Sequence, residues 1–204
     1  MGLDMYLYRI SRISSSEQRK LRGLKEDEIR QQGYSIFHKP SKHESDLLKN
    51  IMPYLRGIKI PMEYFDMKKI IKDFKIPRNA LPCGSMYAHN QVKFDFCSPD
   101  YKKSYVADLN SHELIKKYTY TKLTNCYVSR VAEIGYWRKN YDLQDKIYQA
   151  ADLDYIEIEN CGYYPLTDGM AEAILNDDYE YSKKVKPHDL ICDENSVICY
   201  HEWY

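Results

Sequence analysis

The segment 91–97 (QVKFDFC) constrains the fold most, because its side chains alternate between the two sides of an extended chain. Val92, Phe94 and Phe96 fall on one side, and charged residues fall on the other. Such alternation is typical of a strand with one face in a core and one face in water, which antiparallel sheets allow. Residues 103–109 are predicted to pair with this strand. The pattern therefore indicates a mainly antiparallel sheet.

Capping signals and periodicity place the other elements. Ser14 followed by Glu17 matches a capping box, so a polar helix is predicted to begin there and to end at Gly33. We expect further strands at 5–10, 34–38, 123–132, 155–159, 190–192 and 197–203, helices at 14–32, 45–55, 62–74, 111–114, 137–151 and 167–175, and a loop at 76–85. Strands and helices mix without regular β-α-β alternation. This favours a single α+β domain over residues 1–204, with a mainly antiparallel sheet and several packed helices.

Composition and motifs exclude several classes of protein. The 204 residues are 44% hydrophobic and carry no net charge, which excludes a disordered chain. No apolar run approaches the roughly 18 residues of a membrane span. The first dozen residues are charged and lack a secretory signal, so we expect a cytoplasmic protein with reduced cysteines. Nucleophile, phosphate-loop, dinucleotide and metalloprotease motifs are missing from the sequence. The missing motifs favour a binding protein over an enzyme, and we expect no cofactor. A small nucleotide- or phosphate-binding domain or enzyme that uses the block 135–139 is the alternative.

Charge is distributed unevenly along the chain. Residues 1–78 hold 17 Lys and Arg against 10 Asp and Glu, and residues 79–150 hold 10 against 7. Residues 151–204 hold only 3 basic residues against 13 acidic ones. Polarity of this size is an argument about partners rather than about fold. The two ends either neutralise each other in the folded chain or leave one acidic face for a basic partner.

The acidic last quarter is the first candidate binding surface. Carboxylates interspersed with tyrosines can imitate a phosphate backbone, and tyrosines suit protein recognition. The predicted partner-binding residues are Asp152, Asp154, Glu157, Glu159, Asp177, Asp178, Tyr179, Glu180 and Tyr181. They would occupy the basic nucleic-acid-binding surface of another protein. The alternative is a solvated acidic edge without a partner.

Two other surfaces are alternatives to this one. Trp137, Arg138 and Lys139 are predicted to lie where a strand meets a helix, and that placement favours an anion or nucleotide site. The same tryptophan has helical spacing with later aromatic residues, which favours a core position instead. The second surface would bind nucleic acid directly, and it consists of Arg19, Lys20, Arg22, Lys25, Lys68, Lys69, Lys72 and Lys75.

Metal-binding residue types gather near the end of the chain. His188, Cys192, Cys199 and His201 suit zinc by type, but their spacing matches no common finger. Buried thiols in a terminal hairpin explain the cysteines equally well. We therefore predict no metal site.

Two blocks of sequence point to an origin. Residues 1–7 (MGLDMYL) and 133–139 (EIGYWRK), with a weaker block at 160–164, resemble signatures of an uncharacterised family of bacteriophage and prophage proteins. The resemblance implies a viral origin and a bacterial cytoplasm, and it implies no catalytic residue. Together with the acidic surface, it suggests a phage-derived inhibitor of a host antiviral system, for example a CRISPR-type nuclease. The oligomeric state stays open.

Overall fold

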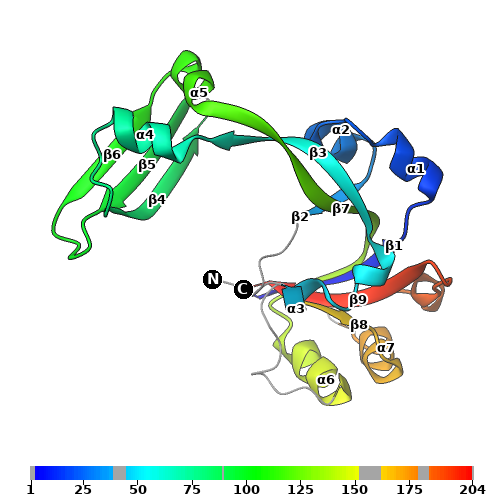
Figure 1. Ribbon diagram of the computed structural model, residues 1–204. Coiled ribbons are helices and arrows are strands. Elements are labelled where there is room, and N and C mark those ends of the chain that lie inside the picture. Colours follow the sequence, from blue (N-terminus) through cyan, green and yellow to red (C-terminus); the bar gives the residue numbers. More distant parts are fainter. Residues whose placement is uncertain (1–2, 39–44, 89, 152–161, 179–183, 204) are drawn as a thin grey trace. The chain divides into compact units, whose positions relative to one another are not determined.

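The computed structural model describes residues 3–38, 45–88, 90–151, 162–178 and 184–203 (Figure 1). It has an α+β fold with two antiparallel sheets, of six and three strands, which confirms the predicted fold class. The chain divides into a larger compact unit, Met1–Ile60 with Asn125–Tyr204, and a smaller unit, Pro61–Thr124. The single domain over residues 1–204 stays a prediction.

The six-stranded sheet is the centre of the larger unit. Its strands run in the order β2-β7-β1-β9-β8, and β3 also pairs with β7. The elements are β1 (Asp4–Ser11), α1 (Ser15–Lys20), α2 (Glu26–Gln31), β2 (Ser35–His38), α3 (Ser45–Leu48), the 3-10 turn η1 (Met52–Tyr54), β3 (Arg56–Phe65), β7 (Thr119–Arg138), α6 (Tyr141–Ala151), β8 (Tyr163–Pro165), α7 (Asp168–Leu175), the 3-10 turn η2 (Pro187–Leu190) and β9 (Ser196–Trp203). β3 and β7 each continue into the smaller unit.

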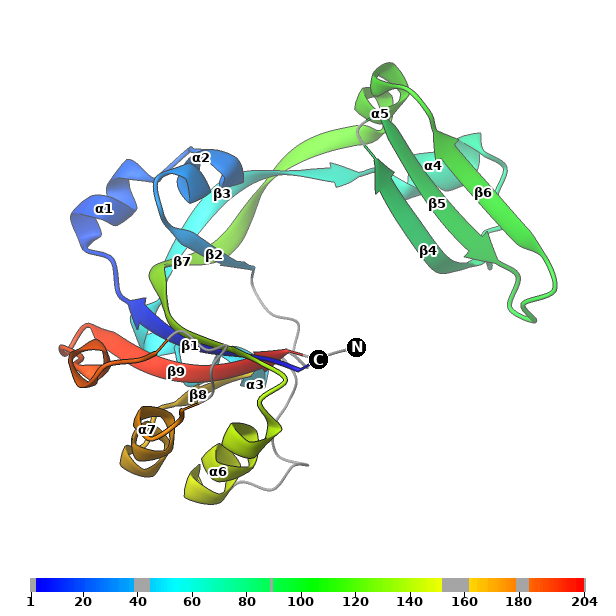
Figure 2. The ribbon, with the colours of Figure 1, turned by 180° about the vertical axis from the view of Figure 1, so that it is seen from behind.

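One face of this sheet is covered by α6 and α7 (Figure 2). β1 lies between β7 and β9 and pairs antiparallel with both, so alternate side chains of β1 point to this face. Met5 and Leu7 are fully buried there, together with Trp137 at the end of β7. The opposite face receives Ile51 and its neighbours from the α3–η1 segment, which pack on Ile10 and Cys199. The sheet is therefore covered on both faces over part of its length.

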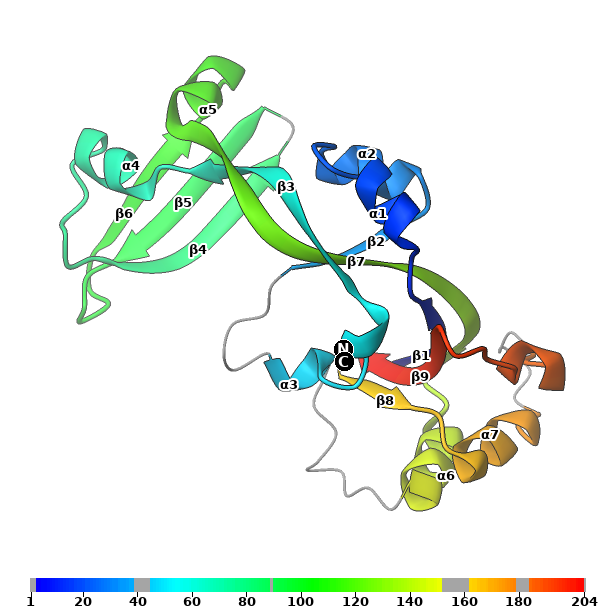
Figure 3. The ribbon, with the colours of Figure 1, turned by 45° about the vertical axis from the view of Figure 1, so that its right-hand side comes forward.

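The smaller unit has its own apolar core. Its elements are α4 (Met67–Asp73), β4 (Leu81–Ala88), β5 (Gln91–Cys97), β6 (Ser104–Leu109) and α5 (His112–Tyr118). The strands form a sheet in the order β4-β5-β6, and α4 and α5 pack on one of its faces (Figure 3). Val92, Phe94 and Phe96 point to that face, so the predicted half-buried strand and its pairing with β6 are confirmed.

The capping predictions hold, although one helix is divided. Ser14 caps α1 through the predicted capping box with Glu17. The helix expected at 167–175 is α7, and the structure shows that the side chain of Thr167 caps it. The predicted helix 14–32 is wrong as one element, because it consists of α1 and α2 with a turn at Gly23, which has a φ of +81°. A residue without Cβ adopts this left-handed conformation at little cost. Gly33 has a φ of +79° and ends α2 as predicted.

The predicted helix 62–74 is wrong in its first third. Residues up to Phe65 belong to β3, and the helix begins at Met67 after Asp66, whose side chain accepts the backbone N–H of Lys69. The preceding Pro61 would suit the first turn of a helix, but it lies inside β3. Among the described strands β3 pairs only with β7, and such an edge strand tolerates the missing N–H of proline.

Four further elements differ from the predictions. Trp137 and Arg138 end β7, so the predicted helix 137–151 begins only at Tyr141. The predicted loop 76–85 contains the first half of β4, because residues 81–85 pair with β5. Residues 190–192 form no strand, so the predicted terminal hairpin is wrong and β9 pairs with β1 and β8 instead. The helix 45–55 is reduced to α3 and η1, and the strand 155–159 lies outside the described residues.

Candidate functional site

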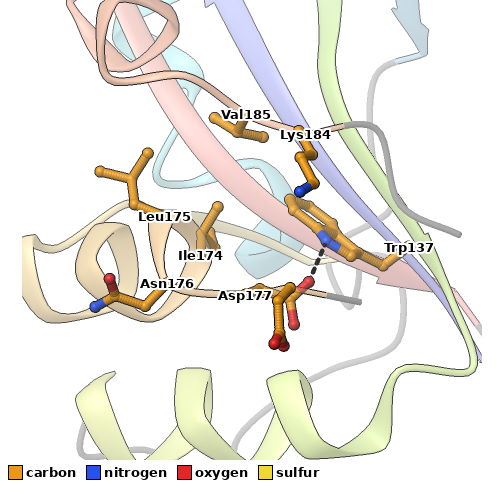
Figure 4. Close-up of a pocket in the computed structure, with 8 residues that line it drawn as sticks. Trp137, Ile174, Leu175, Asn176, Asp177, Lys184 and Val185 are labelled. Carbon is orange, nitrogen blue, oxygen red and sulfur yellow. Dashed lines mark hydrogen bonds between the residues drawn. The ribbon is translucent and has the colours of Figure 1, made fainter. Parts of the chain in front are cut away.

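A pocket of about 240 Å³ lies between the end of β7 and the end of α7 (Figure 4). Ile174, Leu175 and Val185 form its apolar wall, and Trp137 and Asp177 meet at its inner side. The pocket is thus lined by one residue of the predicted anion site, Trp137, and by two residues of the predicted acidic surface, Asp177 and Asp178.

The carboxylate of Asp177 is held inside the larger unit by two donors. Trp137 Nε1 donates to Asp177 Oδ2 over 3.1 Å, and Asn140 Nδ2 donates to Asp177 Oδ1 over 3.1 Å. Asn140 is buried, and its Oδ1 also accepts the backbone N–H of Leu143 in the first turn of α6. Asp177 therefore joins β7, α6 and the end of α7. This carboxylate has a structural role in the larger unit, and neighbouring Asp178 is exposed.

The predicted anion-binding trio does not converge on this pocket. Trp137 is 1% exposed, whereas Arg138, the next residue of the strand, is exposed and lies 3.8 Å from the carboxylate of Asp4. Lys139 is also exposed, and its backbone N–H donates to the carbonyl of Leu3. The φ of Lys139 is +56°, which ends the strand. An anion site at this block stays a prediction.

Most of the predicted acidic surface cannot be placed. Seven of its nine residues lie outside the described residues, namely Asp152, Asp154, Glu157, Glu159, Tyr179, Glu180 and Tyr181. Of the other two, Asp177 is bonded to the core as described above and only Asp178 presents its side chain to solvent. The acidic surface as a whole stays a prediction.

The four zinc-type residues have separate environments. Burial raises the pKa of the Cys199 thiol to about 12, and Cys192 is exposed. His201 stacks on the ring of Tyr163 with centroids 4.7 Å apart, and burial lowers its pKa. His188 lies 3.5 Å from Asp189. Within the described ranges, no group of three or more His, Cys, Asp or Glu residues is arranged to hold a metal.

An aromatic row crosses the face of the large sheet opposite α6 and α7, and sequence reasoning missed it. The ring of Tyr6 stacks on that of Tyr8 with centroids 5.3 Å apart, and it also contacts Tyr136. The ring of His201 contacts the rings of Tyr6 and Tyr8 and also that of Tyr163. All five side chains are partly exposed. The aromatic alternation at positions 6 and 8 was the available signal. The ring contacts are stacked or tilted, and the row accounts for four of the 21 tyrosines.

In the smaller unit, lysines of the two helices α4 and α5 form one surface. Lys68 and Lys72 lie four residues apart on the solvent side of α4, opposite the buried Ile70. Lys75 is exposed just after the helix, where its φ is +55°. Lys69 Nζ donates to the backbone carbonyl of Lys117 in α5 over 3.1 Å. We name the exposed lysines of these two helices, together with Lys75 just after α4, the basic face; it consists of Lys68, Lys69, Lys72, Lys75, Lys116 and Lys117.

Tyr118 lies beneath the basic face and orders it. The ammonium groups of Lys69 and Lys117 lie 5.4 and 5.0 Å from the centroid of its ring, within the range of a cation–π contact. The hydroxyl of Tyr118 donates to Asp73, which also lies 3.9 Å from Lys117. The carboxylate of Asp66 accepts the Lys69 backbone N–H. These two carboxylates are thus engaged within the unit, and the lysines outnumber them.

A hollow of about 480 Å³ adjoins the basic face. Phe65, Asp66, Met67, Lys68 and Tyr120 line it. The ring of Tyr120 is 50% exposed. The hollow therefore combines an aromatic surface with a lysine at its rim.

Only part of the basic face was predicted. The four lysines of residues 68–75 were assigned to a nucleic-acid surface, while Lys116 and Lys117 were not. Arg19, Lys20, Arg22 and Lys25, assigned to the same surface, are exposed on the larger unit.

Comparison with known proteins finds no matching family model, no matching curated protein and no matching solved structure. The resemblance to phage proteins, and the bacterial cytoplasm that it implies, stay predictions. Along the described ranges, no helix has the length and apolar character needed to cross a bilayer.

Proposed function

We propose that this protein binds nucleic acid through the basic face of the smaller unit. The observation that supports the proposal most is the hydrogen bond from Lys69 Nζ to the Lys117 carbonyl, which joins residues 48 positions apart. It gathers lysines of two helices into one surface. The side chains of Lys68 and Lys72 are exposed and do not pack in the core, so their ammonium groups can contact phosphates.

Counterion release provides the free energy of this binding. Each lysine that neutralises a phosphate releases a condensed cation, so affinity falls steeply as salt concentration rises. The exposed ring of Tyr120 beside Lys68 adds a surface on which an unpaired base stacks, which favours single strands. No side chain of this surface reads a base edge in a defined pattern. The proposed binding is therefore tolerant of sequence.

Fluorescence anisotropy with a labelled single-stranded oligonucleotide, over a series of salt concentrations, tests the proposal. The variant that replaces Lys68 and Lys72 with glutamine should bind at least about ten-fold more weakly, with a log–log salt slope smaller by roughly one unit per lysine. Replacing Tyr120 with alanine should cost about 1–3 kcal/mol of binding free energy.

The matched control replaces Lys102 and Lys103, which are exposed before β6 in the same unit, with glutamine. It removes the same charge away from α4 and α5, and we expect a much smaller loss. Absence of binding at low salt contradicts the proposal. Equal losses in the control and test variants would show that any lysine of the smaller unit contributes equally, which contradicts a defined surface.

The acidic-surface hypothesis, a phage-derived inhibitor that covers the basic surface of a host nuclease, keeps a test of its own. Charge reversal of Asp178 and Glu180 leaves intact the Trp137–Asp177 hydrogen bond, so loss of a partner would not reflect misfolding. Affinity capture from bacterial lysate with the native chain and this variant would identify such a partner. A nuclease retained by both proteins would contradict the hypothesis.

A further inference from the structure

The edge strand β4 is exposed along its whole length. All eight residues, Leu81–Ala88, are solvent-exposed, and none carries a charge. β4 pairs with β5 on one side, and no other described strand pairs with it. Its second side therefore presents a row of backbone N–H and C=O groups to solvent.

Proteins protect such edges with charged side chains, prolines, bulges or covering elements. β4 has Pro82 and a change of register between Pro82 and Gly84, both near its beginning. The remaining segment, 84–88, keeps a continuous register with β5 and has neither device. The opposite edge, β6, contains Asp108 and follows Lys102 and Lys103. Only one of the two edges is thus unprotected.

The exposed segment is held in an ordered conformation. Tyr87 lies 6.2 Å from the ring of Phe65 and 6.2 Å from that of Phe94, so its side chain is anchored although it is 64% exposed. Met86 is 45% exposed. An edge that is already extended and anchored loses little conformational entropy when another strand is added.

We propose that β4 pairs with β4 of a second copy of this chain, antiparallel and about a two-fold axis. Such pairing joins two three-stranded sheets into one of six strands, and it uses both unprotected edges at once. Because both edges have the same sequence, a charged edge strand would bring like charges close together near the two-fold axis, and like charges facing each other across a strand pair are destabilising. The uncharged sequence of β4 avoids this repulsion.

The absence of charge also favours a second copy over a foreign strand. Charged groups give an interface its selectivity and speed of encounter, and β4 has none with which to select another protein. A second copy needs no selection by charge, since its edge matches in length and polarity. The dimer is independent of nucleic-acid binding, and it would present two basic faces to a long strand.

Sedimentation velocity of the full chain, without nucleic acid, tests the proposal across about a hundred-fold range of protein concentration. We expect a concentration-dependent dimer. Ser85→Lys should weaken its association at least about ten-fold, because lysine is a characteristic protection of edge strands. The matched control is Val106→Lys on the other edge, where Val106 is 44% exposed, and it should leave association unchanged.

Hydrogen exchange gives a second readout in the native protein. Amides of the 84–88 segment should exchange more slowly as concentration rises, while those of β6 should not change. A native chain that is monomeric at every concentration overturns the proposal. So does an equal effect of the two lysine variants, or slower exchange along β6 alone.

Discussion

In the larger unit five polar side chains are buried, Ser129, Asn140, Gln144, Ser196 and Glu202, and the smaller unit contributes none to this set among the described residues. The buried carboxylate of Glu202 accepts hydrogen bonds from Tyr148, Tyr200 and Gln144, which joins β9 to α6. The core of the smaller unit is formed by apolar and aromatic side chains, and its charged groups lie on the surface or in partly buried pairs.

This difference separates two uses of polar residues. A buried polar network stabilises a structure only when each group has its partner, so it favours one arrangement of the surrounding elements. Surface lysines impose no such arrangement and remain available to ligands. We therefore expect substitutions in the larger unit to change stability, and substitutions on the surface of the smaller unit to change binding.

The largest expected effect is at Trp137. Replacing this buried side chain with alanine should lower the free energy of unfolding by about 3–5 kcal/mol, because it leaves a cavity and removes the bond to Asp177. Trp203, the second tryptophan of the chain, is 55% exposed and provides the control. Its replacement with alanine should have a much smaller effect in urea denaturation. Similar losses of unfolding free energy in the two variants would contradict the expected difference between buried and surface positions.

A smaller effect is expected at Asp177, compared with its neighbour Asp178. Asp177→Ala removes the acceptor of Trp137 and Asn140 and should cost about 1–3 kcal/mol of stability. The side chain of Asp178 is exposed, so Asp178→Ala should change stability by less than about 0.5 kcal/mol. Thermal and urea unfolding of the two variants measure the difference. If both changes were neutral, the hydrogen bonds at Asp177 would not contribute to the fold as described.

Sequence patterns predicted best the elements whose signal is local. The alternation at Val92, Phe94 and Phe96 and the caps at Ser14 and Gly33 depend on neighbours in the chain, and the structure confirms them. The strand at Pro61 was missed, because proline suits both an edge strand and a first helical turn. Only pairing with β7 decides between these alternatives.

Trp137 shows a second limit of local patterns. Its spacing from the aromatic residues of α6 matches a helix, yet the residue ends β7 and packs on that helix from the sheet. The sequence allowed a core position for Trp137, but it did not indicate that this residue ends a strand. For a similar reason, the sequence predicted only part of the basic face. Lys68 and Lys72 belong to one helical stripe, whereas the contact with Lys117 depends on tertiary packing that no spacing reveals.

The smallest expected effect concerns Glu17 on the surface of the larger unit, and it depends on pH. The carboxylate accepts the backbone N–H of Ser14 and lies 2.9 Å from Arg130, which lowers its pKa to about 2. A carboxylate with a lowered folded-state pKa stabilises the protein above its unfolded pKa, and this contribution is lost as pH falls from about 4.5 to about 2. Glu17→Gln should therefore cost less than about 1 kcal/mol at neutral pH, because the ion pair lies at the surface where solvent screens it, and nothing at the acid end. Asp27→Asn, on the exposed side of α2, is the control. If the difference between native chain and Glu17→Gln stayed constant across this window in urea titrations, the ionised carboxylate would not be the stabilising group.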